Sequence, residues 1–207
     1  MAYRNLFLRM LFSIMIIFVY LATLYINFEY IYYLIIFLYL IVNLEVLFIF
    51  KKITLPIILY ILVSFLFCIS LDYNYENIIK FNLFIITIIT FDIFSYFFGK
   101  LYGKNKIFKK ISPNKTYEGL IGGISSALFI SLAYLYFFGI AININSIFII
   151  IIIIVSSFLG DIIESYFKRV NNLKNSSNLL PGHGGFFDRF DSFIFAIIPY
   201  SFTQSLL

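Results

Sequence analysis

The sequence predicts an all-α membrane protein, a polytopic bundle of about seven transmembrane helices. Of its 207 residues, 62% are hydrophobic and 12% are charged, and the mean hydropathy is +1.00. Soluble chains carry about 25% charged residues, so the excess apolar surface must face lipid. The apolar runs are continuous, whereas the strands of a membrane barrel alternate between lipid-facing and lumen-facing residues. The single cysteine, Cys68, excludes a disulfide scaffold.

Each predicted span is an apolar run of about the 20 residues that a helix needs to cross a bilayer. The runs are separated by charged or polar residues, which in chain order are Arg9, Glu29, Lys51, Asp72, Lys80, Lys100, Glu118, Asn145, Lys168 and Asp191. The predicted spans cover residues 10–27, 30–50, 53–71, 81–98, 120–138, 146–167 and 192–207.

The basic residues orient these spans. All 15 lysines and arginines except Lys80 fall on one side of the seven-span arrangement, beginning with Arg4 and Arg9 before the first span. Because basic loops stay in the cytoplasm, the N-terminus is expected there, and the first span is expected to be an uncleaved anchor in the cell (inner) membrane. The positions of the basic residues, more than the net charge of +5, therefore indicate orientation and contact with membrane lipids, and no nucleic-acid partner is expected.

The polar residues divide the chain into two predicted regions. Residues 1–80 are expected to be N-terminal transmembrane helices, and residues 81–207 a catalytic membrane region with two cytoplasmic loops, 99–118 and 168–191. Gly119 and Gly123 form a small-residue pair that permits close helix approach, which favours packing within the chain and leaves a homodimer open. In the second span, Asn43 and Glu45 are assigned to interhelical hydrogen bonds.

Two pairs of acids indicate a metal site at the second loop. Asp161 and Glu164 follow a short apolar run and share one helical face, and Asp188 and Asp191 have the same spacing of three. Mg²⁺ is typically held by carboxylates together with substrate phosphates, and neighbouring basic residues would neutralise the phosphates. The alternative is an ion-pair network in which Glu164 and Lys168 serve only each other.

Three further features complete the candidate site. Gly184 and Gly185 leave backbone N–H groups accessible to an anion, and the adjoining His183 would either donate to phosphate or cap the turn. Asp92 is an acid inside the fourth span, which is a functional hypothesis by default. The segment 112–116 is expected to be a turn leading into the fifth span, at a helix N-terminus suited to anions.

At these residues the chain resembles the phosphatidate cytidylyltransferase family, also called CDP-diacylglycerol synthases. The family signature runs from Ser-x-apolar-Lys-Arg through Pro-x-His-Gly-Gly to Asp-Arg-apolar-Asp. It is matched without a gap by Ser165, Lys168, Arg169, Lys174, Ser177, Leu180, Pro181, His183, Gly184, Gly185, Asp188, Arg189 and Asp191. One position departs, because Asn175 stands where the family has Asp. The resemblance covers about the C-terminal half of the chain.

The resemblance implies that CTP and phosphatidate react to give CDP-diacylglycerol and pyrophosphate, with Mg²⁺ as cofactor and a second metal ion left open. The implied catalytic residues are Asp161, Asp188, Asp191, Lys168 and His183. The implied substrate-binding residues are Ser112, Lys115, Thr116, Arg169, Lys174, Gly184, Gly185 and Arg189. The implied metal ligands are Asp161, Asp188, Asp191, Glu164 and Asp92.

Other functions stay open at this point. The same chemistry on an ether-lipid or polyprenyl phosphate is the nearest alternative. An ion-coupled transporter is the second, because it also needs intramembrane acids, although such acids lie near the midplane on broken helices. A family member that has lost activity is the third, with Asn175 as its one indication.

Overall fold

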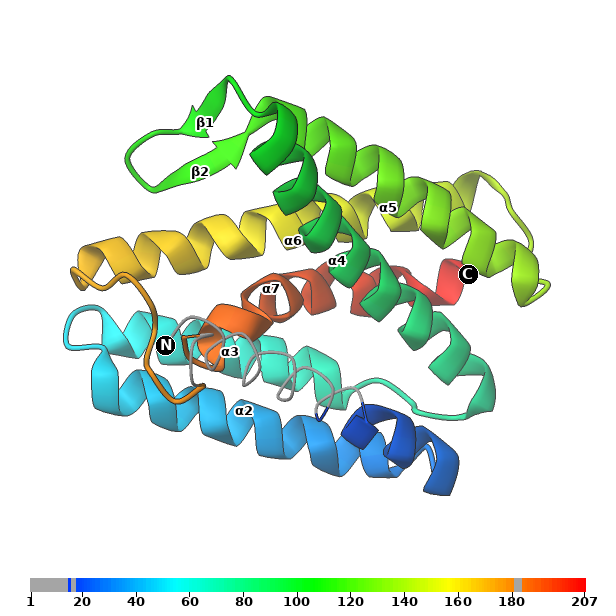
Figure 1. Ribbon diagram of the computed structural model, residues 1–207. Coiled ribbons are helices and arrows are strands. Elements are labelled where there is room, and N and C mark those ends of the chain that lie inside the picture. Colours follow the sequence, from blue (N-terminus) through cyan, green and yellow to red (C-terminus); the bar gives the residue numbers. More distant parts are fainter. Residues whose placement is uncertain (1–14, 16–17, 181–183) are drawn as a thin grey trace. The chain divides into compact units, whose positions relative to one another are not determined.

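The chain is described here from a computed structural model, which covers residues 15, 18–180 and 184–207. Their regular secondary structure is helical apart from one small hairpin, which confirms the predicted all-α class. Residues 18–26 are helical. The helices that follow are α2 (Tyr30–Ile49), α3 (Thr54–Ile69), α4 (Tyr75–Tyr102), α5 (Tyr117–Phe137), α6 (Ile144–Val170), α7 (Phe187–Thr203) and the short 3₁₀ helix η1 (Gln204–Leu206) (Figure 1). Arg4, Arg9 and part of the first predicted span lie outside the described residues.

Within the described residues, four helices are long and apolar enough to cross a bilayer: α2, α4, α5 and α6. They carry large apolar side chains on their outer surfaces, such as Phe48 and Phe129, which are 81% and 75% exposed. Such side chains are stable only against lipid or another apolar surface, so the chain is a multi-pass membrane protein. The shorter α3 is also apolar.

Helices α4 and α7 differ most from the predicted spans. Helix α4 runs from Tyr75 to Tyr102, past the predicted 81–98 at both ends. Helix α7 begins at Phe187, five residues before the predicted start at 192, and it contains Pro199. Both differences arise at charged residues, because Lys80, Lys100 and Asp191 end the apolar runs but lie inside the helices.

A β-hairpin lies between α4 and α5, where a turn was predicted. Strand β1 (Lys106–Phe108) pairs antiparallel with β2 (Ser112–Thr116), with Lys106 opposite Thr116 and Phe108 opposite Ser112. The expectation of a turn over 112–116 was therefore wrong. The hairpin passes directly into α5, whose N-cap is Thr116.

The chain forms two compact units. The first consists of Met1–Tyr75 and Phe167–Phe190. In it, α2 and α3 are antiparallel neighbours, and a hydrogen bond joins Tyr39 Oη and Ser64 Oγ between them (Figure 1). The turn after α2 is held by Asn171, whose Oδ1 accepts from the backbone N–H groups of Lys51 and Lys52 at 3.0 and 2.7 Å.

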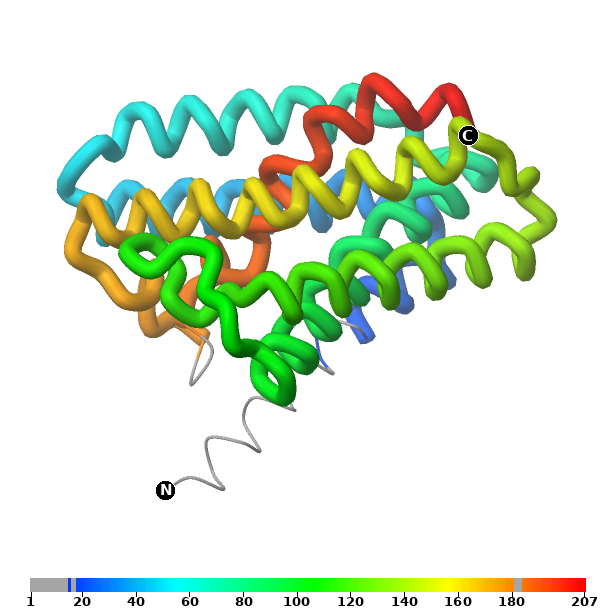
Figure 2. The backbone as a smooth tube through the Cα atoms, turned by 90° about the horizontal axis from the view of Figure 1, so that it is seen from above, coloured from blue at the N-terminus to red at the C-terminus, as the bar shows by residue number. Residues whose placement is uncertain are grey.

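The second unit consists of Glu76–Tyr166 and Asp191–Leu207. Helices α5 and α6 run in opposite directions, joined by residues 138–143 (Figure 2). The core of this unit is a buried apolar cluster to which α4, α5 and α6 contribute Leu83, Phe91, Ala127, Leu135, Ile150 and Ile154. From α7, Tyr200 stacks on Phe84 of α4 with ring centroids 4.5 Å apart.

The predicted glycine pair packs inside this second unit. A Cβ at Gly119 would lie 2.6 Å from the carbonyl oxygen of Ser95, and one at Gly123 would lie 2.8 Å from Ser95 Cβ. Both contacts are too close for a side chain, so the glycines let α5 approach α4 within one chain.

Candidate active site

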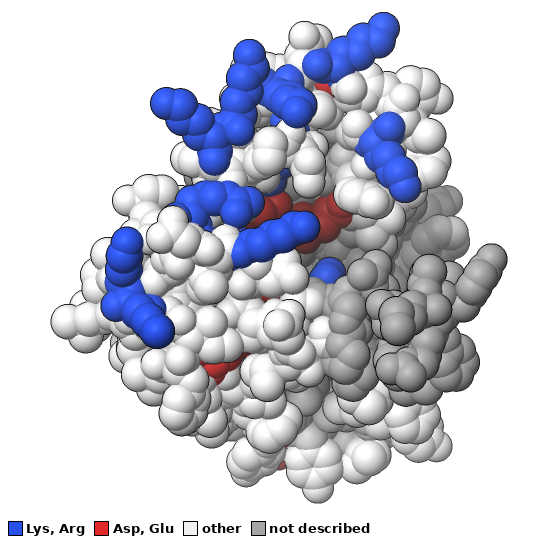
Figure 3. All heavy atoms as spheres, turned by 60° about the vertical axis from the view of Figure 1, so that its left-hand side comes forward, with Lys and Arg blue, Asp and Glu red and all other residues white. Residues whose placement is uncertain are grey.

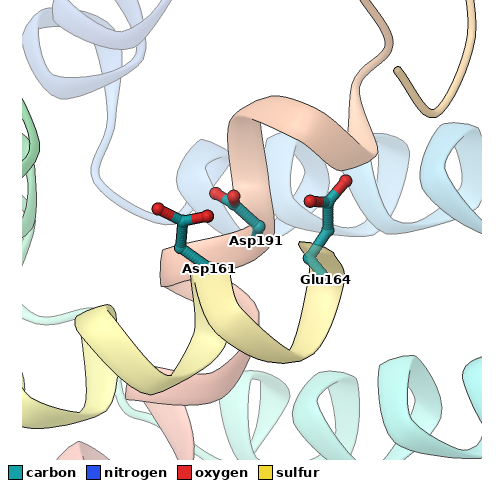
Figure 4. Close-up of side chains that lie close together, drawn as sticks. All are labelled: Asp161, Glu164 and Asp191. Atoms are coloured by element: carbon teal, nitrogen blue, oxygen red, sulfur yellow. The ribbon is translucent and has the colours of Figure 1, made fainter. Parts of the chain in front are cut away.

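Three carboxylates meet in the second unit. Asp161 and Glu164 lie one turn apart on α6, and Asp191 comes from α7. One oxygen from each lies within 4.8 Å of the others. Figure 4 shows the three groups on the same side of α6, with Asp191 between Asp161 and Glu164. The spacing of three predicted that Asp161 and Glu164 share one helical face, and the number of acids near the basic loop led to the prediction that Asp191 joins them.

Gly160 is the reason that α7 can come this close. A Cβ at Gly160 would lie 2.6 Å from the carbonyl oxygen of Asp191 and 3.2 Å from the Cα of Ser192. The backbone of α7 therefore rests directly against α6, one residue before Asp161. The glycine sets the separation of the acids on the two helices.

A lysine from the hairpin balances part of this charge. Lys115 Nζ lies 2.8 Å from Asp161 Oδ2 and 4.5 Å from the centroid of the Phe158 ring. The Lys115 side chain is 16% exposed and that of Asp161 is 35% exposed, whereas Glu164 is fully buried. The arrangement thus places carboxylate oxygens and a lysine ammonium group together at one partly accessible site.

Asp92 lies in the same unit, on α4. Its Oδ1 accepts hydrogen bonds from the hydroxyls of Ser157 and Ser192, each at 3.4 Å. It is not a member of the three-carboxylate cluster that the described residues form. Its predicted role as a supporting metal ligand stays a prediction.

The hairpin positions the remaining predicted residues of this unit. Thr116 is buried, and its hydroxyl caps α5 by accepting from the N–H of Gly119 at 3.2 Å. Ser112 begins β2 opposite Phe108. The backbone N–H groups of Lys104 and Asn105 donate to Glu118. Thr116 thus caps α5, and its contact with substrate stays a prediction.

Basic side chains surround the hairpin. A shallow surface hollow there is lined by Lys104, Asn105, Lys106, Lys109 and Tyr117. On the face drawn in Figure 3, lysine and arginine side chains project outward, whereas the few visible carboxylates are recessed among neighbouring atoms. Such a surface favours anionic partners, including lipid headgroups.

The signature loop belongs to the first unit, and Asp188 organises it. Asp188 Oδ1 lies 2.7 Å from Lys168 Nζ. Its Oδ2 accepts from Ser176 N, Ser176 Oγ and Gly185 N, each at 2.9 Å. The N–H of Gly185, which the sequence analysis assigned to an anion, therefore faces the carboxylate of the protein itself. The predicted metal and substrate roles of Asp188 and Gly185 stay predictions.

Three basic residues of the loop lie at its surface. Arg169, Lys174 and Arg189 are exposed, and Arg169 Nη1 donates to the carbonyl of Leu173 at 3.1 Å. Gly184 has φ +88°, a conformation that L side chains rarely adopt, and its carbonyl accepts from Leu180 N. His183 lies outside the described residues.

One residue beside this loop was not among the predicted site residues. Glu45, on α2, accepts hydrogen bonds at Oε2 from the backbone N–H groups of Phe186 and Phe187, at 2.7 and 3.3 Å. The sequence analysis assigned Glu45 to an interhelical bond. An acid inside an apolar span was the available signal, but nothing in the sequence indicated that its partner lies about 140 residues away. Asn43 donates to Tyr39 O within α2.

Comparison with known proteins now decides the family. The model of the cytidylyltransferase family matches residues 1–206. The chain belongs to this family. It is similar to the phosphatidate cytidylyltransferase of Staphylococcus aureus (strain COL), with 49% identity over 108 residues, which is 51% of this chain and 41% of the relative. The corresponding protein of Staphylococcus haemolyticus is 46% identical over 108 residues, with the same coverage.

The aligned stretch spans less than half the length of these cytidylyltransferases. These matches confirm the family that the signature residues predicted.

Proposed function

We propose that this member of the cytidylyltransferase family condenses CTP with phosphatidate, giving CDP-diacylglycerol and pyrophosphate. The observation that carries the proposal is the cluster of Asp161, Glu164 and Asp191 with Lys115 at its edge. The name of the similar staphylococcal proteins supports the choice of substrates. The transporter alternative is disfavoured, because the acids gather beside a lysine at a helix–helix contact.

The cluster fits a hard divalent cation, and we propose Asp161, Glu164 and Asp191 as ligands of Mg²⁺. All three groups supply oxygen, and their separation of at most 4.8 Å suits one shared ion. Three protein ligands leave positions for water and for substrate phosphate. Bound there, the cation would neutralise charge on the reacting phosphates. We propose that Asp92 and Asp188 support this site without being its main ligands. The proposal does not specify whether a second metal ion binds.

In this reaction the side chains need to position the two substrates and neutralise the charge on their phosphates, and they do not need to abstract a proton. A phosphate oxygen of phosphatidate attacks the α-phosphorus of CTP, and the bond from that phosphorus to the oxygen bridging to the β-phosphorus breaks. The attacking phosphate is already an anion, so no strong general base is required. We assign Lys115 to the phosphates because its ammonium group lies 2.8 Å from Asp161 Oδ2, at the edge of the cluster, and because among the described residues its one other hydrogen bond is a long one of 3.4 Å to the carbonyl oxygen of Phe158.

The basic residues of the signature are proposed to hold the remaining phosphate oxygens. Lys168, Arg169, Lys174 and Arg189 follow the family pattern, and three of the four are exposed. Arginine suits this task because its planar group binds two phosphate oxygens together. We further propose that this chemistry takes place at the cytoplasmic face of the cell membrane, where soluble CTP meets a lipid headgroup.

The test uses the full chain in detergent with phosphatidate, Mg²⁺ and radiolabelled CTP, and it measures labelled CDP-diacylglycerol and released pyrophosphate. Wild type should form both in equal amounts. Asp191→Asn should lower kcat/KM by about 100-fold or more, because it removes a charged ligand of the proposed ion. Glu118→Gln, which alters a carboxylate outside the cluster, should stay within about twofold.

Three outcomes would contradict the proposal. The first is turnover of an ether-lipid or polyprenyl phosphate that is at least ten times faster than turnover of phosphatidate. The second is ion transport without consumption of CTP. The third is full activity in the presence of a chelator, which would exclude the metal part.

A further inference from the structure

We infer that Glu45 is a positioning residue that holds the turn at the start of α7, residues 184–187, in its working conformation. The contacts that carry this inference all lie within the first compact unit. The expected effect on catalysis rests on the proposed function, whereas the expected effect on the loop does not.

Glu45 caps α7 from another helix. The first N–H groups of a helix have no acceptor within it, and a carboxylate placed there is favoured by the helix dipole as well. Here Glu45 Oε2 accepts from Phe186 N at 2.7 Å and from Phe187 N at 3.3 Å. The side chain is only 2% exposed, so water cannot readily replace it as the acceptor.

The other oxygen of Glu45 is fitted against Gly185. A Cβ at Gly185 would overlap Glu45 Oε1 and the hydroxyl oxygens of Ser176 and Ser177. Glu45 Oε1 has no hydrogen-bond partner among the described residues. The missing side chain of Gly185 therefore makes the space in which the carboxylate reaches the start of α7.

Two carboxylates divide three consecutive N–H groups between them. Asp188 Oδ2 accepts from Gly185 N at 2.9 Å, and Glu45 accepts from the next two. Asp188 is in turn paired with Lys168. Removing Glu45 would leave the buried N–H of Phe187 and the partly buried N–H of Phe186 without their acceptor and release the turn that carries Asp188.

The end of α2 is itself held in place. Asn171 binds the backbone of Lys51 and Lys52, and the Phe50 ring meets the Phe187 ring edge-on at 5.8 Å. Glu45 thus lies on a fixed support, one turn before the end of α2. This is the arrangement expected of a residue that transmits order to a loop rather than one that contacts substrate.

The test compares Glu45→Ala, Glu45→Gln and Glu45→Asp with the control Ser64→Ala, which removes a buried hydrogen bond of the same unit away from the loop. Hydrogen–deuterium exchange of the amides of Phe186 and Phe187 is measured, together with kcat and KM for CTP. Glu45→Ala should speed exchange at these amides at least tenfold and lower kcat at least tenfold, with KM changed by less than threefold. Glu45→Gln, which keeps an acceptor oxygen, should restore both to within threefold.

The inference is overturned if Glu45→Ala exchanges and turns over like wild type, or if Ser64→Ala has the same effect. If Glu45→Ala does not fold, Glu45→Asp decides, because its shorter side chain should speed exchange at Phe187 while the protein stays folded; unchanged exchange overturns the inference. A wild type without activity but with protected amides would refute the proposed function and leave the positioning role supported.

Discussion

Lys115 and Asp161 form an ion pair that the proposed reaction would have to rearrange. The pair is partly accessible, with Nζ and Oδ2 2.8 Å apart. An ion pair at such a position contributes little to stability by itself, so exchange of its partner for a substrate phosphate costs little. Lys168 and Asp188 differ, because Asp188 accepts three further hydrogen bonds from the loop. The second pair is therefore held by more contacts than the first, and its partners should be harder to exchange.

Asn175 gives a prediction at the level of a single residue. It stands where the family signature has Asp, and its side chain is exposed. Asn175→Asp should therefore change kcat/KM by less than about threefold, as expected for a surface substitution. Steady-state assays with CTP and phosphatidate measure this, with Asn178→Asp in the same loop as the control for added charge. A gain of tenfold or more in Asn175→Asp alone would show that the wild type is impaired.

For single residues, the sequence predicted which acids belong to the candidate site better than it predicted the contacts that each acid makes. Spacing of three placed Asp161 and Glu164 on one face, and the structure joins them to Asp191. The same spacing made Asp188 and Asp191 look equivalent. Only the folded loop reveals that Asp188 satisfies the donors of Ser176 and Gly185, because those contacts depend on backbone directions that spacing does not encode.

Among the elements, the contact between α6 and α7 governs the geometry of the acidic cluster. At Gly160 the backbone of α7 lies against α6, where a Cβ would come within 2.6 Å of Asp191 O. The added methyl group of Gly160→Ala should push α7 away and separate Asp191 from Asp161 and Glu164. Such overpacking costs about 1–3 kcal/mol.

Gly160→Ala should therefore lower kcat/KM at least tenfold while the far-ultraviolet circular dichroism spectrum stays unchanged, since alanine favours a helix. Ser125→Ala on α5, whose hydroxyl donates to Ile121 O in its own helix, is the control and should keep wild-type activity. Wild-type kinetics in Gly160→Ala would show that the spacing of α6 and α7 does not set the activity.

The helices were predictable because each is a long apolar run with polar ends, whereas the hairpin was not. Strand β1 has only three residues, too few for the alternation that indicates a strand. Strand β2 contains Pro113, which argues for a turn when read from the sequence. The start of α7 was missed for a related reason, because Asp188 in its first turn reads as part of a loop although acids are favoured there.

For the whole molecule, the N-terminal helices do more than anchor the chain. The first compact unit combines α2 and α3 with residues Phe167–Phe190 of the signature. Asn171 and Glu45 supply the hydrogen bonds between these distant stretches. The signature was predicted to lie in the C-terminal region. The sequence could not indicate that it packs with α2 and α3, because the apolar spans have similar compositions and nothing in them shows which span contacts which loop.

Membrane orientation is a prediction for the whole chain. Cys68 is buried and is removed as Cys68→Ser, and single cysteines are then introduced as Lys109→Cys in the hairpin and Ala141→Cys between α5 and α6. The distribution of basic residues predicts that Ala141→Cys reacts with a membrane-impermeant maleimide on intact cells. Lys109→Cys should react only after permeabilisation. The reverse pattern would place the basic loops outside.

The central claim is that Asp161, Glu164 and Asp191 bind one shared cation, and Mn²⁺ binding followed by electron paramagnetic resonance tests it most directly. Mn²⁺ accepts the same oxygen ligands as Mg²⁺. Wild type should bind Mn²⁺, Asp161→Asn and Asp191→Asn should bind it at least about tenfold more weakly, and Glu118→Gln should match wild type. Equal affinity in all four proteins would contradict the account.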